Sequence, residues 1–194
     1  MREADGPDEA LMSRAARGNA GAFDALLGRH GDAVFHYLTR LVADPSVAED
    51  LAQECWLRVW RARHSYHPSA AFRTWLFTVA RRLALDHAKA PRLPTGPLTE
   101  GLPGAAGPCD QVIAGALEQA MGEALARLPP EQREAVVLRD MEGLPYADIA
   151  RITGCPLGTV KSRLNAGRAR LQEVARAWLT EEGHEEGHEE GQDA

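Results

Sequence analysis

The sequence has few cysteines, few aromatic residues and no long apolar run. Its cysteines, Cys55, Cys109 and Cys155, stand far apart in 194 residues, which fits neither a paired disulfide framework nor a CxxC metal knuckle. Aromatic residues make up 6%, so a core must be packed mainly from Leu, Ala and Val. No window approaches the roughly 18 apolar residues of a membrane span, and the charged residues 1–10 do not form a secretory signal. These absences predict a soluble, cytoplasmic protein without a membrane span.

Clean two-residue alternation of apolar and polar residues is also missing, which argues against a sheet. Apolar residues instead recur at three-to-four spacing, and Ser46 with Glu49 has the pattern of a helix capping box. The fold class predicted from these patterns is all-α. Helices are expected over residues 22–42, 46–63, 72–89, 111–128 and 131–141, with a short helix at 146–152 and a longer one from 157.

Two segments break the helical pattern. Residues 90–110 contain five prolines and four glycines, a composition typical of a flexible linker. Residues 179–194 repeat Glu, Gly and His and are predicted to form a disordered acidic tail. The chain is therefore expected to fold as two small helical domains, residues 8–89 and residues 111–178.

The net charge of −6 hides two basic stretches. Residues 180–194 hold seven acids and no Lys or Arg, which leaves 22 − 21 = +1 for the rest of the chain. Residues 56–92 carry eight basic residues and one acid, and residues 151–176 carry six basic residues and one acid. Such a distribution indicates a polyanionic partner; the alternative is that these cations only solvate helix faces.

The strongest local motif is a helix-turn-helix over residues 146–171. Gly154 suits the positive φ of a tight turn, and Pro156 suits the start of the second helix. Val160 and Leu164 face inward at a spacing of four. The side chains left on the outside are short, polar or cationic, as a recognition helix in the DNA major groove requires; an ordinary αα-hairpin with a solvated face is the alternative. These outward residues are Thr159, Lys161, Ser162, Asn165 and Arg168.

Three motifs in order resemble the extracytoplasmic-function (group 4) sigma factors of the sigma-70 family. Residues 128–171 are similar to the domain that binds the −35 promoter element. Residues 48–62 are similar to the helix that docks on core RNA polymerase, and residues 72–89 to the helix that binds the −10 element. The resemblance implies a sigma domain 2 at residues 8–89 and a helix-turn-helix sigma domain 4 at residues 111–178.

The resemblance also implies a function and partners. The chain would bind core RNA polymerase at its β′ clamp helices and β flap, direct promoter-specific initiation, help to melt promoter DNA, and be held silent by an anti-sigma factor. It would not itself be an enzyme and would need no cofactor. Two other classes stay open: a helix-turn-helix regulator that acts without docking on core polymerase, and an adaptor that uses its helix faces.

Candidate residues follow for each partner. Single-stranded DNA is bound by aromatic rings that stack on bases and by cations that pair with phosphates, although Trp75 equally fits a core position. For the −10 element the candidates are His67, Ser69, Phe72, Arg73, Trp75, Arg81 and Arg82. For the −35 element they are Arg139, Thr159, Lys161, Ser162, Arg163, Asn165 and Arg168. For core polymerase they are Asp50, Gln53, Glu54, Leu57 and Trp60 on one helical face.

One competing motif lies in the tail. His184 and His188 formally match the H-E-x-x-H pattern of zinc proteases. That chemistry needs two histidines on a rigid helix beside a cleft, whereas these lie in an acidic, glycine-containing repeat. The sequence therefore predicts no catalytic residues and no metal site, with weak metal capture by the two histidines as the alternative to a solvated tail. Cys55 is predicted to be a small core residue.

Overall fold

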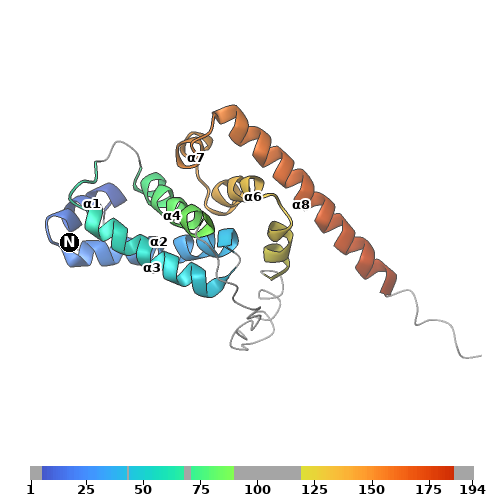
Figure 1. The fold of residues 1–194 in the computed structure, drawn as a ribbon, viewed down its shortest axis with the longest axis horizontal. Coiled ribbons are helices and arrows are strands. Elements are labelled where there is room, and N and C mark those ends of the chain that lie inside the picture. Colours follow the sequence, from blue (N-terminus) through green and yellow to red (C-terminus); the bar gives the residue numbers. More distant parts are fainter. Residues whose placement is uncertain (1–5, 43, 68–70, 90–118, 186–194) are drawn as a thin grey trace, which may run out of the picture.

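The computed structural model describes residues 6–42, 44–67, 71–89 and 119–185, with side chains up to residue 177. Within these ranges every regular element is a helix and no strand occurs, which confirms the all-α prediction. The elements are α1 (Asp8–Ala16), α2 (Ala20–Val42), α3 (Pro45–Ala62), α4 (Phe72–Lys89), α6 (Pro130–Val136), the π-helical η1 (Val137–Met141), α7 (Tyr146–Thr153) and α8 (Leu157–Glu185) (Figure 1). Residues 119–126 form a further helical segment.

The N-terminal domain comprises α1 to α4, and α2 is its central helix. Helices α1, α3 and α4 all pack against α2. Its buried residues, among them Leu26, Val34 and Leu38, recur along one face. Burial of that stripe is the main stabilising contribution, because each fully buried Leu or Val adds about 1.5–3 kcal/mol.

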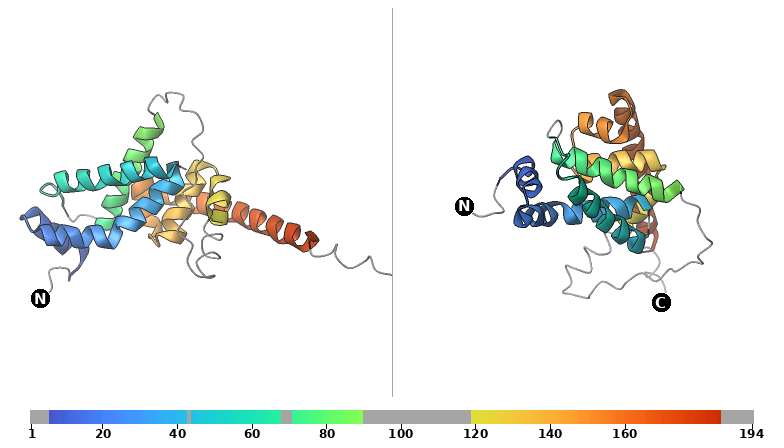
Figure 2. Two further views of the ribbon diagram at one scale, coloured as in Figure 1. Left: turned by 90° about the horizontal axis from the view of Figure 1, so that it is seen from below. Right: turned by 60° about the vertical axis from the view of Figure 1, so that its left-hand side comes forward.

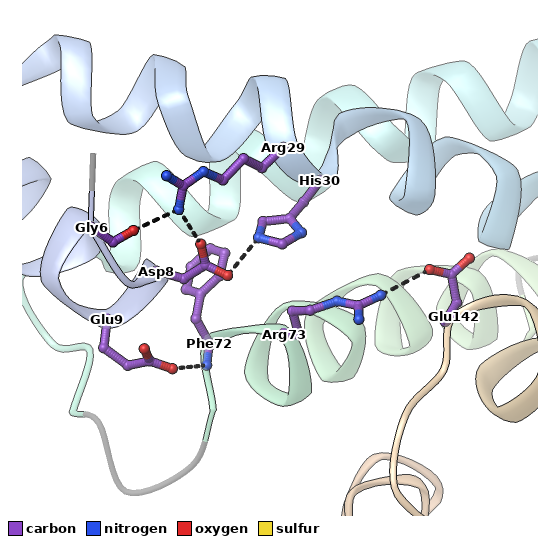
Figure 3. Close-up of polar contacts among 8 residues, drawn as sticks. All are labelled: Gly6, Asp8, Glu9, Arg29, His30, Phe72, Arg73 and Glu142. Carbon is purple, nitrogen blue, oxygen red and sulfur yellow. Dashed lines mark hydrogen bonds and ion pairs between the residues drawn. The ribbon is translucent and has the colours of Figure 1, made fainter. Parts of the chain in front are cut away.

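Helix α1 was not predicted from the sequence, and it fixes the start of α4. The Glu9 carboxylate accepts a hydrogen bond from the backbone N–H of Phe72 over 3.0 Å. Next to it, Asp8 accepts from Arg29 over 2.9 Å and lies 2.7 Å from Nε2 of His30 on α2 (Figure 3). Glu9 of α1 therefore satisfies a backbone N–H at the N-terminus of α4 from a distant part of the chain.

The predicted capping box at Ser46 and Glu49 is wrong. The Asp44 side chain accepts hydrogen bonds from the backbone N–H groups of Ser46 over 3.0 Å and of Val47 over 3.2 Å. Helix α3 therefore begins at Pro45, where the missing N–H and fixed φ of proline suit the first turn.

In the C-terminal domain, α7 and α8 form the predicted helix-turn-helix. Gly154 ends α7 with a φ of +70°, the left-handed conformation that glycine adopts without strain. Helix α8 crosses α6 at Gly167, where a Cβ atom would lie 2.8 Å from Cγ2 of Val136 and 3.3 Å from the Gln132 carbonyl oxygen. The absence of a side chain at Gly167 therefore allows the close packing that holds α8 on α6.

Two expected boundaries differ in the structure. Residues 131–141 were predicted as one α-helix, but the second part, η1, is π-helical. The tail was predicted to begin at residue 179, whereas α8 continues to Glu185 and extends away from the rest of the molecule (Figures 1 and 2). The composition of residues 179–185 indicated a tail, but the helix started by the preceding residues propagates through them. The linker predicted at 90–110 and residues 186–194 lie outside the described residues.

The two domains pack against each other. Helix α4 contacts α7, and α2 contacts both α6 and η1, so α4 lies beside the helix-turn-helix (Figure 1). The buried residues of both domains form one continuous cluster. This arrangement places side chains of the C-terminal domain directly on the basic helix α4.

Candidate nucleic-acid interface

The exposed face of α8 carries the residues predicted to read bases. Lys161, Ser162 and Asn165 are exposed, whereas Val160 and Leu164 are buried in the domain core. Thr159 is half-buried, and its backbone carbonyl accepts a hydrogen bond from the Ser162 hydroxyl over 3.0 Å. The apolar residues thus fix α8 while its polar side chains point outward, as the sequence predicts.

Three arginines flank that face, and each is held by a group of its own domain. Arg139 donates to the Leu144 carbonyl over 3.1 Å and lies over the Tyr146 ring. Arg163 donates to Glu131 over 2.7 Å. Arg168 donates twice to Asp140, once over 2.9 Å, and these hydrogen bonds raise the pKa of Arg168. These partners fix the positions of the guanidinium groups. A DNA phosphate that binds one of them would have to displace the present acceptor or share the guanidinium group with it.

On α4, the residues predicted for the −10 element are dispersed. Arg82 and, before the helix, His67 are exposed. Trp75 is half-buried and packs on Tyr66, with ring centroids 5.1 Å apart. Ser69 lies outside the described residues. Only part of the predicted set therefore forms an open surface.

The prediction that Phe72 contacts DNA is wrong for this arrangement. Its side chain is 1% exposed and packs among the rings of His30, Tyr66 and Trp75. The Phe72 ring is part of the core of the N-terminal domain because α1 and α2 cover the start of α4. A base would have to stack on a different ring.

Arg73 and Arg81 are paired with acids of the C-terminal domain. Arg73 donates to Glu142 over 3.1 Å (Figure 3), and Nε of Arg81 donates to Oε1 of Glu134 over 2.7 Å. Both side chains are half-buried, with 34% of Arg73 and 21% of Arg81 exposed. Each guanidinium group thus has a carboxylate of the C-terminal domain as a hydrogen-bond partner.

A groove of about 500 Å³ lies between α2 and α3. Leu57 is 48% exposed and Leu27 40% exposed along it, and exposed apolar side chains that line a groove indicate a protein partner. Of the residues predicted for core polymerase, Gln53, Leu57 and Trp60 line this groove, whereas Asp50 and Glu54 do not. Its lining consists of Phe23, Leu27, Gly31, Glu49, Ala52, Gln53, Trp56, Leu57 and Trp60.

Sequence reasoning missed the contribution of α2 to the groove. Phe23 stacks edge-on against both Trp56 and Trp60, with centroids 5.8 and 4.9 Å apart. These three rings form the floor of the groove. The signal was present, because Phe23 and Leu27 are apolar residues at a spacing of four within the helix expected over residues 22–42.

The chain is similar to known proteins along most of its length. Residues 26–92 match the family model "Sigma-70 region 2", and residues 118–171 match "Sigma-70, region 4". The RNA polymerase sigma-H factor of Pseudomonas aeruginosa is 32% identical over 186 residues, which cover 90% of this chain and 96% of that protein. The chain belongs to the sigma-70 family.

Relatives place this sigma factor in the extracytoplasmic-function group. The factor SigM of Mycobacterium tuberculosis is 38% identical over 169 residues, which cover 86% of this chain and 84% of SigM. Among solved structures, CnrH in complex with the cytosolic domain of CnrY has a TM-score of 0.68 at 26% identity and covers 88% of this chain and 97% of CnrH. RpoE of Bartonella quintana, solved with the anti-sigma factor NepR, has a TM-score of 0.62 at 26% identity and covers 79% of this chain and 96% of RpoE. The sigma factor thus directs promoter-specific transcription, as predicted.

The matched regions coincide with the surfaces described above. Region 2 covers helix α4 and every groove-lining residue except Phe23, and region 4 covers the helix-turn-helix. Cys55 on α3 is buried in the core of the N-terminal domain, as predicted, and burial raises the pKa of its thiol to about 12. The thiol therefore stays protonated and unreactive near neutral pH.

Metal capture by His184 and His188, the alternative that the sequence left open, falls on side chains that the structure does not describe. In the described part of the sigma factor, no three His, Cys, Asp or Glu side chains lie together as a metal site would need. The side chain of His184 and the whole of His188 lie outside that part. None of the described helices has the length and apolar character to span a membrane.

Proposed function

We propose that this sigma factor docks on core RNA polymerase through the groove between α2 and α3 and binds promoter DNA with α4 and α8. The observation that carries the docking proposal is the pair Leu27 and Leu57, which are exposed beside a floor of three aromatic rings. A helical partner could bury these apolar side chains, and the β′ clamp helices are the partner that the family resemblance implies. Gln53 and Glu49 at the rim suit polar or basic groups of that partner.

On the DNA side, Lys161, Ser162 and Asn165 read bases of the −35 element, with Thr159 at their edge. Arg139, Arg163 and Arg168 hold phosphates. The −10 element is bound by Arg82, Trp75 and His67 together with Ser69, Arg73 and Arg81. We further propose that domain 4 contacts the β flap, that the protein works in the cytoplasm without a cofactor, and that the polymerase, not the sigma factor, supplies the catalysis.

Replacement of Leu57 by Glu tests the docking surface. A carboxylate in the apolar groove should weaken binding of purified core RNA polymerase by tenfold or more, because a buried unpaired charge is strongly unfavourable. Leu57 is half-exposed, so the fold should tolerate the change. Leu85→Glu is the matched control, since Leu85 is 38% exposed on α4 and does not line the groove.

Binding to core polymerase and run-off transcription are the two readouts. Wild type and Leu85→Glu should both bind core polymerase, and wild type should give promoter-specific RNA. If wild type bound duplex promoter DNA but never core polymerase, the protein would instead be a helix-turn-helix regulator. If Leu57→Glu bound core polymerase as tightly as Leu85→Glu does, the groove would not be the docking surface.

We also propose an anti-sigma factor as a partner of the free protein. The support is that the similar RpoE was solved in complex with an anti-sigma factor. Affinity purification of the tagged sigma factor from its native cell should recover a non-polymerase protein that blocks run-off transcription when added back. Recovery of polymerase subunits alone would contradict this proposal.

A further inference from the structure

Leu157 is an exposed apolar residue at the start of the recognition helix. It is the first residue of α8 and is 44% exposed. By contrast, Ile149, Val160 and Leu164 of the same helix-turn-helix are at most 1% exposed. The domain core therefore uses only part of the Leu157 side chain. A single exposed leucine is common on protein surfaces, so its place on the helix decides what it can contact.

Helical spacing places Leu157 in line with two residues proposed to read bases. Lys161 and Asn165 follow it at intervals of four, and residues four apart lie one above the other on one face of an α-helix. All three residues are exposed. With a rise of about 1.5 Å per residue, they span about 12 Å along the helix axis. We call Leu157, Lys161 and Asn165 the reading stripe.

The structure around Leu157 fixes its position. Gly154 ends α7 with a φ of +70°, and the Pro156 carbonyl accepts a hydrogen bond from the Val160 N–H over 3.1 Å. On the other side of α8, Val160 and Leu164 are buried in the domain core. A side chain on such a rigid element is placed more accurately than one on a loop. When α8 binds DNA, Leu157 therefore enters the groove at a defined position.

The chemistry of its side chain restricts what Leu157 can recognise. The isobutyl group neither donates nor accepts a hydrogen bond, so it cannot pair with a phosphate or with the polar atoms of a base. The apolar feature of the base edges in the major groove is the C5-methyl group of thymine. Contact with that methyl group removes apolar surface of both partners from water. Contact with the amino group of cytosine or adenine would instead desolvate a donor without pairing it.

We propose that Leu157 is a specificity-determining residue that recognises a thymine of the −35 element by contact with its C5-methyl group. This inference rests on the proposed function, which places α8 in the major groove at that element. It deepens that function by naming a base and the atom that is read. Lys161 lies one helical turn, about 6 Å, from Leu157, so the thymine lies within about two base pairs of the base that Lys161 reads.

Two variants test the apolar contact. Leu157→Ala removes most of the side chain, and Leu157→Met keeps an apolar side chain of similar size. Leu85→Ala is the matched control, because Leu85 is 38% exposed and lies on α4, outside the helix-turn-helix. All three positions tolerate substitution in the fold because none is buried, and circular dichroism should show unchanged helical content.

The first readout is the base preference of the holoenzyme assembled from the full-length chain and core RNA polymerase. Promoter fragments that are randomised over the −35 segment are selected by binding and sequenced. Wild type should enrich a thymine beside the position whose preference is relaxed in Lys161→Ala. Leu157→Ala should lose this enrichment and keep the preferences at the other positions. Leu157→Met and Leu85→Ala should both keep it.

The second readout removes the methyl group from the DNA instead of the protein. Deoxyuridine at the selected position lacks the C5-methyl group of thymine and keeps its pairing and its O4 acceptor. Wild-type holoenzyme should bind the deoxyuridine duplex about three- to fourfold more weakly, as expected for one methyl group that is no longer buried. Leu157→Ala should bind both duplexes equally, because it has already lost the contact. Lys161→Ala should bind both more weakly and keep their ratio.

The outcomes separate this inference from the proposed function. If Leu157→Ala keeps the thymine enrichment and the full effect of deoxyuridine, Leu157 is not the residue that reads the methyl group. If wild type enriches no thymine beside the Lys161 position, methyl recognition is refuted. Both results leave promoter selection by the holoenzyme intact. If wild type fails to bind core polymerase or selects no −35 sequence, the proposed function is refuted and the role of Leu157 falls with it.

Discussion

The side chains on and beside the exposed face of α8 differ in whether a carboxylate of the same domain already binds them. Lys161 and Asn165 are exposed, whereas Arg163 is engaged with Glu131 and Arg168 with Asp140. An exposed side chain can adjust to a base edge, and a held guanidinium group is better suited to a phosphate at a fixed position. The two groups should therefore respond differently to mutation.

Lys161→Ala and Asn165→Ala should relax the preference for individual −35 bases. A base-reading side chain accounts for about 1–3 kcal/mol of discrimination. Arg163→Ala should instead weaken all sequences alike and lower the slope of log affinity against log salt by about one. Affinities of the holoenzyme for a set of −35 variants at several salt concentrations measure both effects. An unchanged base preference in Lys161→Ala and Asn165→Ala would refute the assignment.

Glu142 should make stability depend on pH. Burial raises the pKa of its carboxyl group, and the cations Arg73, Arg40 and His36 oppose that shift. Because the folded pKa lies above the unfolded one, the folded state binds the proton more tightly. The contribution of Glu142 is therefore fully present below its ordinary pKa and is lost as the pH rises through the raised value.

The comparison with Glu142→Gln isolates this titration. As the pH falls from neutral to the ordinary pKa of glutamate, the free energy of unfolding of wild type should rise relative to that of Glu142→Gln, since only wild type takes up this proton. Urea unfolding at each pH measures the difference. A difference that is constant or that falls with acidification would contradict the predicted sign.

At the scale of helices, close packing at Gly167 holds the recognition helix on α6. Gly167→Ala would place a methyl group 2.8 Å from Val136 Cγ2, and we expect a loss of about 1–3 kcal/mol of stability from overpacking. Gly158→Ala, on the same helix, meets nothing within 4 Å and should stabilise by about 0.4–1 kcal/mol. Thermal unfolding of the two variants should give shifts of opposite sign; a stabilising Gly167→Ala would disprove the packing argument.

Glu9 of helix α1 should stabilise the N-terminus of α4. Glu9→Ala removes the acceptor of the Phe72 N–H and should lower stability by about 1 kcal/mol, as loss of a helix cap does. Glu9→Gln keeps an acceptor oxygen and should lose less. Urea unfolding measures both values. If the two variants were equally destabilised, the charge of Glu9 rather than its cap would be responsible.

The helices and the helix-turn-helix could be predicted from sequence because they rest on local patterns. Apolar spacing located α2, α3, α4 and α8, and Gly154 with Pro156 located the turn. Helix α1 is short, and its role depends on Phe72, 63 positions away. Phe72 itself was misassigned because its burial depends on rings from other elements, and Asp44 was overlooked because Ser46 offered an equally good cap.

The candidate site was predictable in part for the same reason. The outward residues of α8 follow from helical spacing alone, and Leu57 and Trp60 follow from one face of α3. No local pattern indicates that Glu134 is buried, because its partners Tyr37 and Arg81 lie 97 and 53 positions away. The groove required α2 and α3 to be placed side by side before Phe23 could be recognised as its floor.

For the whole molecule, the groove and the domain contact should act independently. The groove lining and the group Tyr37, Arg81 and Glu134 share no residue. Leu57→Glu should therefore weaken binding to core polymerase without changing the radius of gyration. Glu134→Gln should increase the radius of gyration without weakening that binding. The double variant should show both effects undiminished, as expected for sites without shared partners. A double variant that regained core binding would reveal coupling between the two surfaces.

The long sequence separation across the domain contact has a consequence during protein synthesis. The N-terminal domain is complete once Lys89 has been made, but Glu134 and Glu142 follow only after the intervening residues. At roughly 5–20 residues per second, the ribosome leaves Arg73 and Arg81 of each nascent chain without these partners for on the order of seconds. Every newly made molecule thus passes through an interval in which its basic helix faces the nucleic acid of the cell, and it closes only when translation is nearly finished.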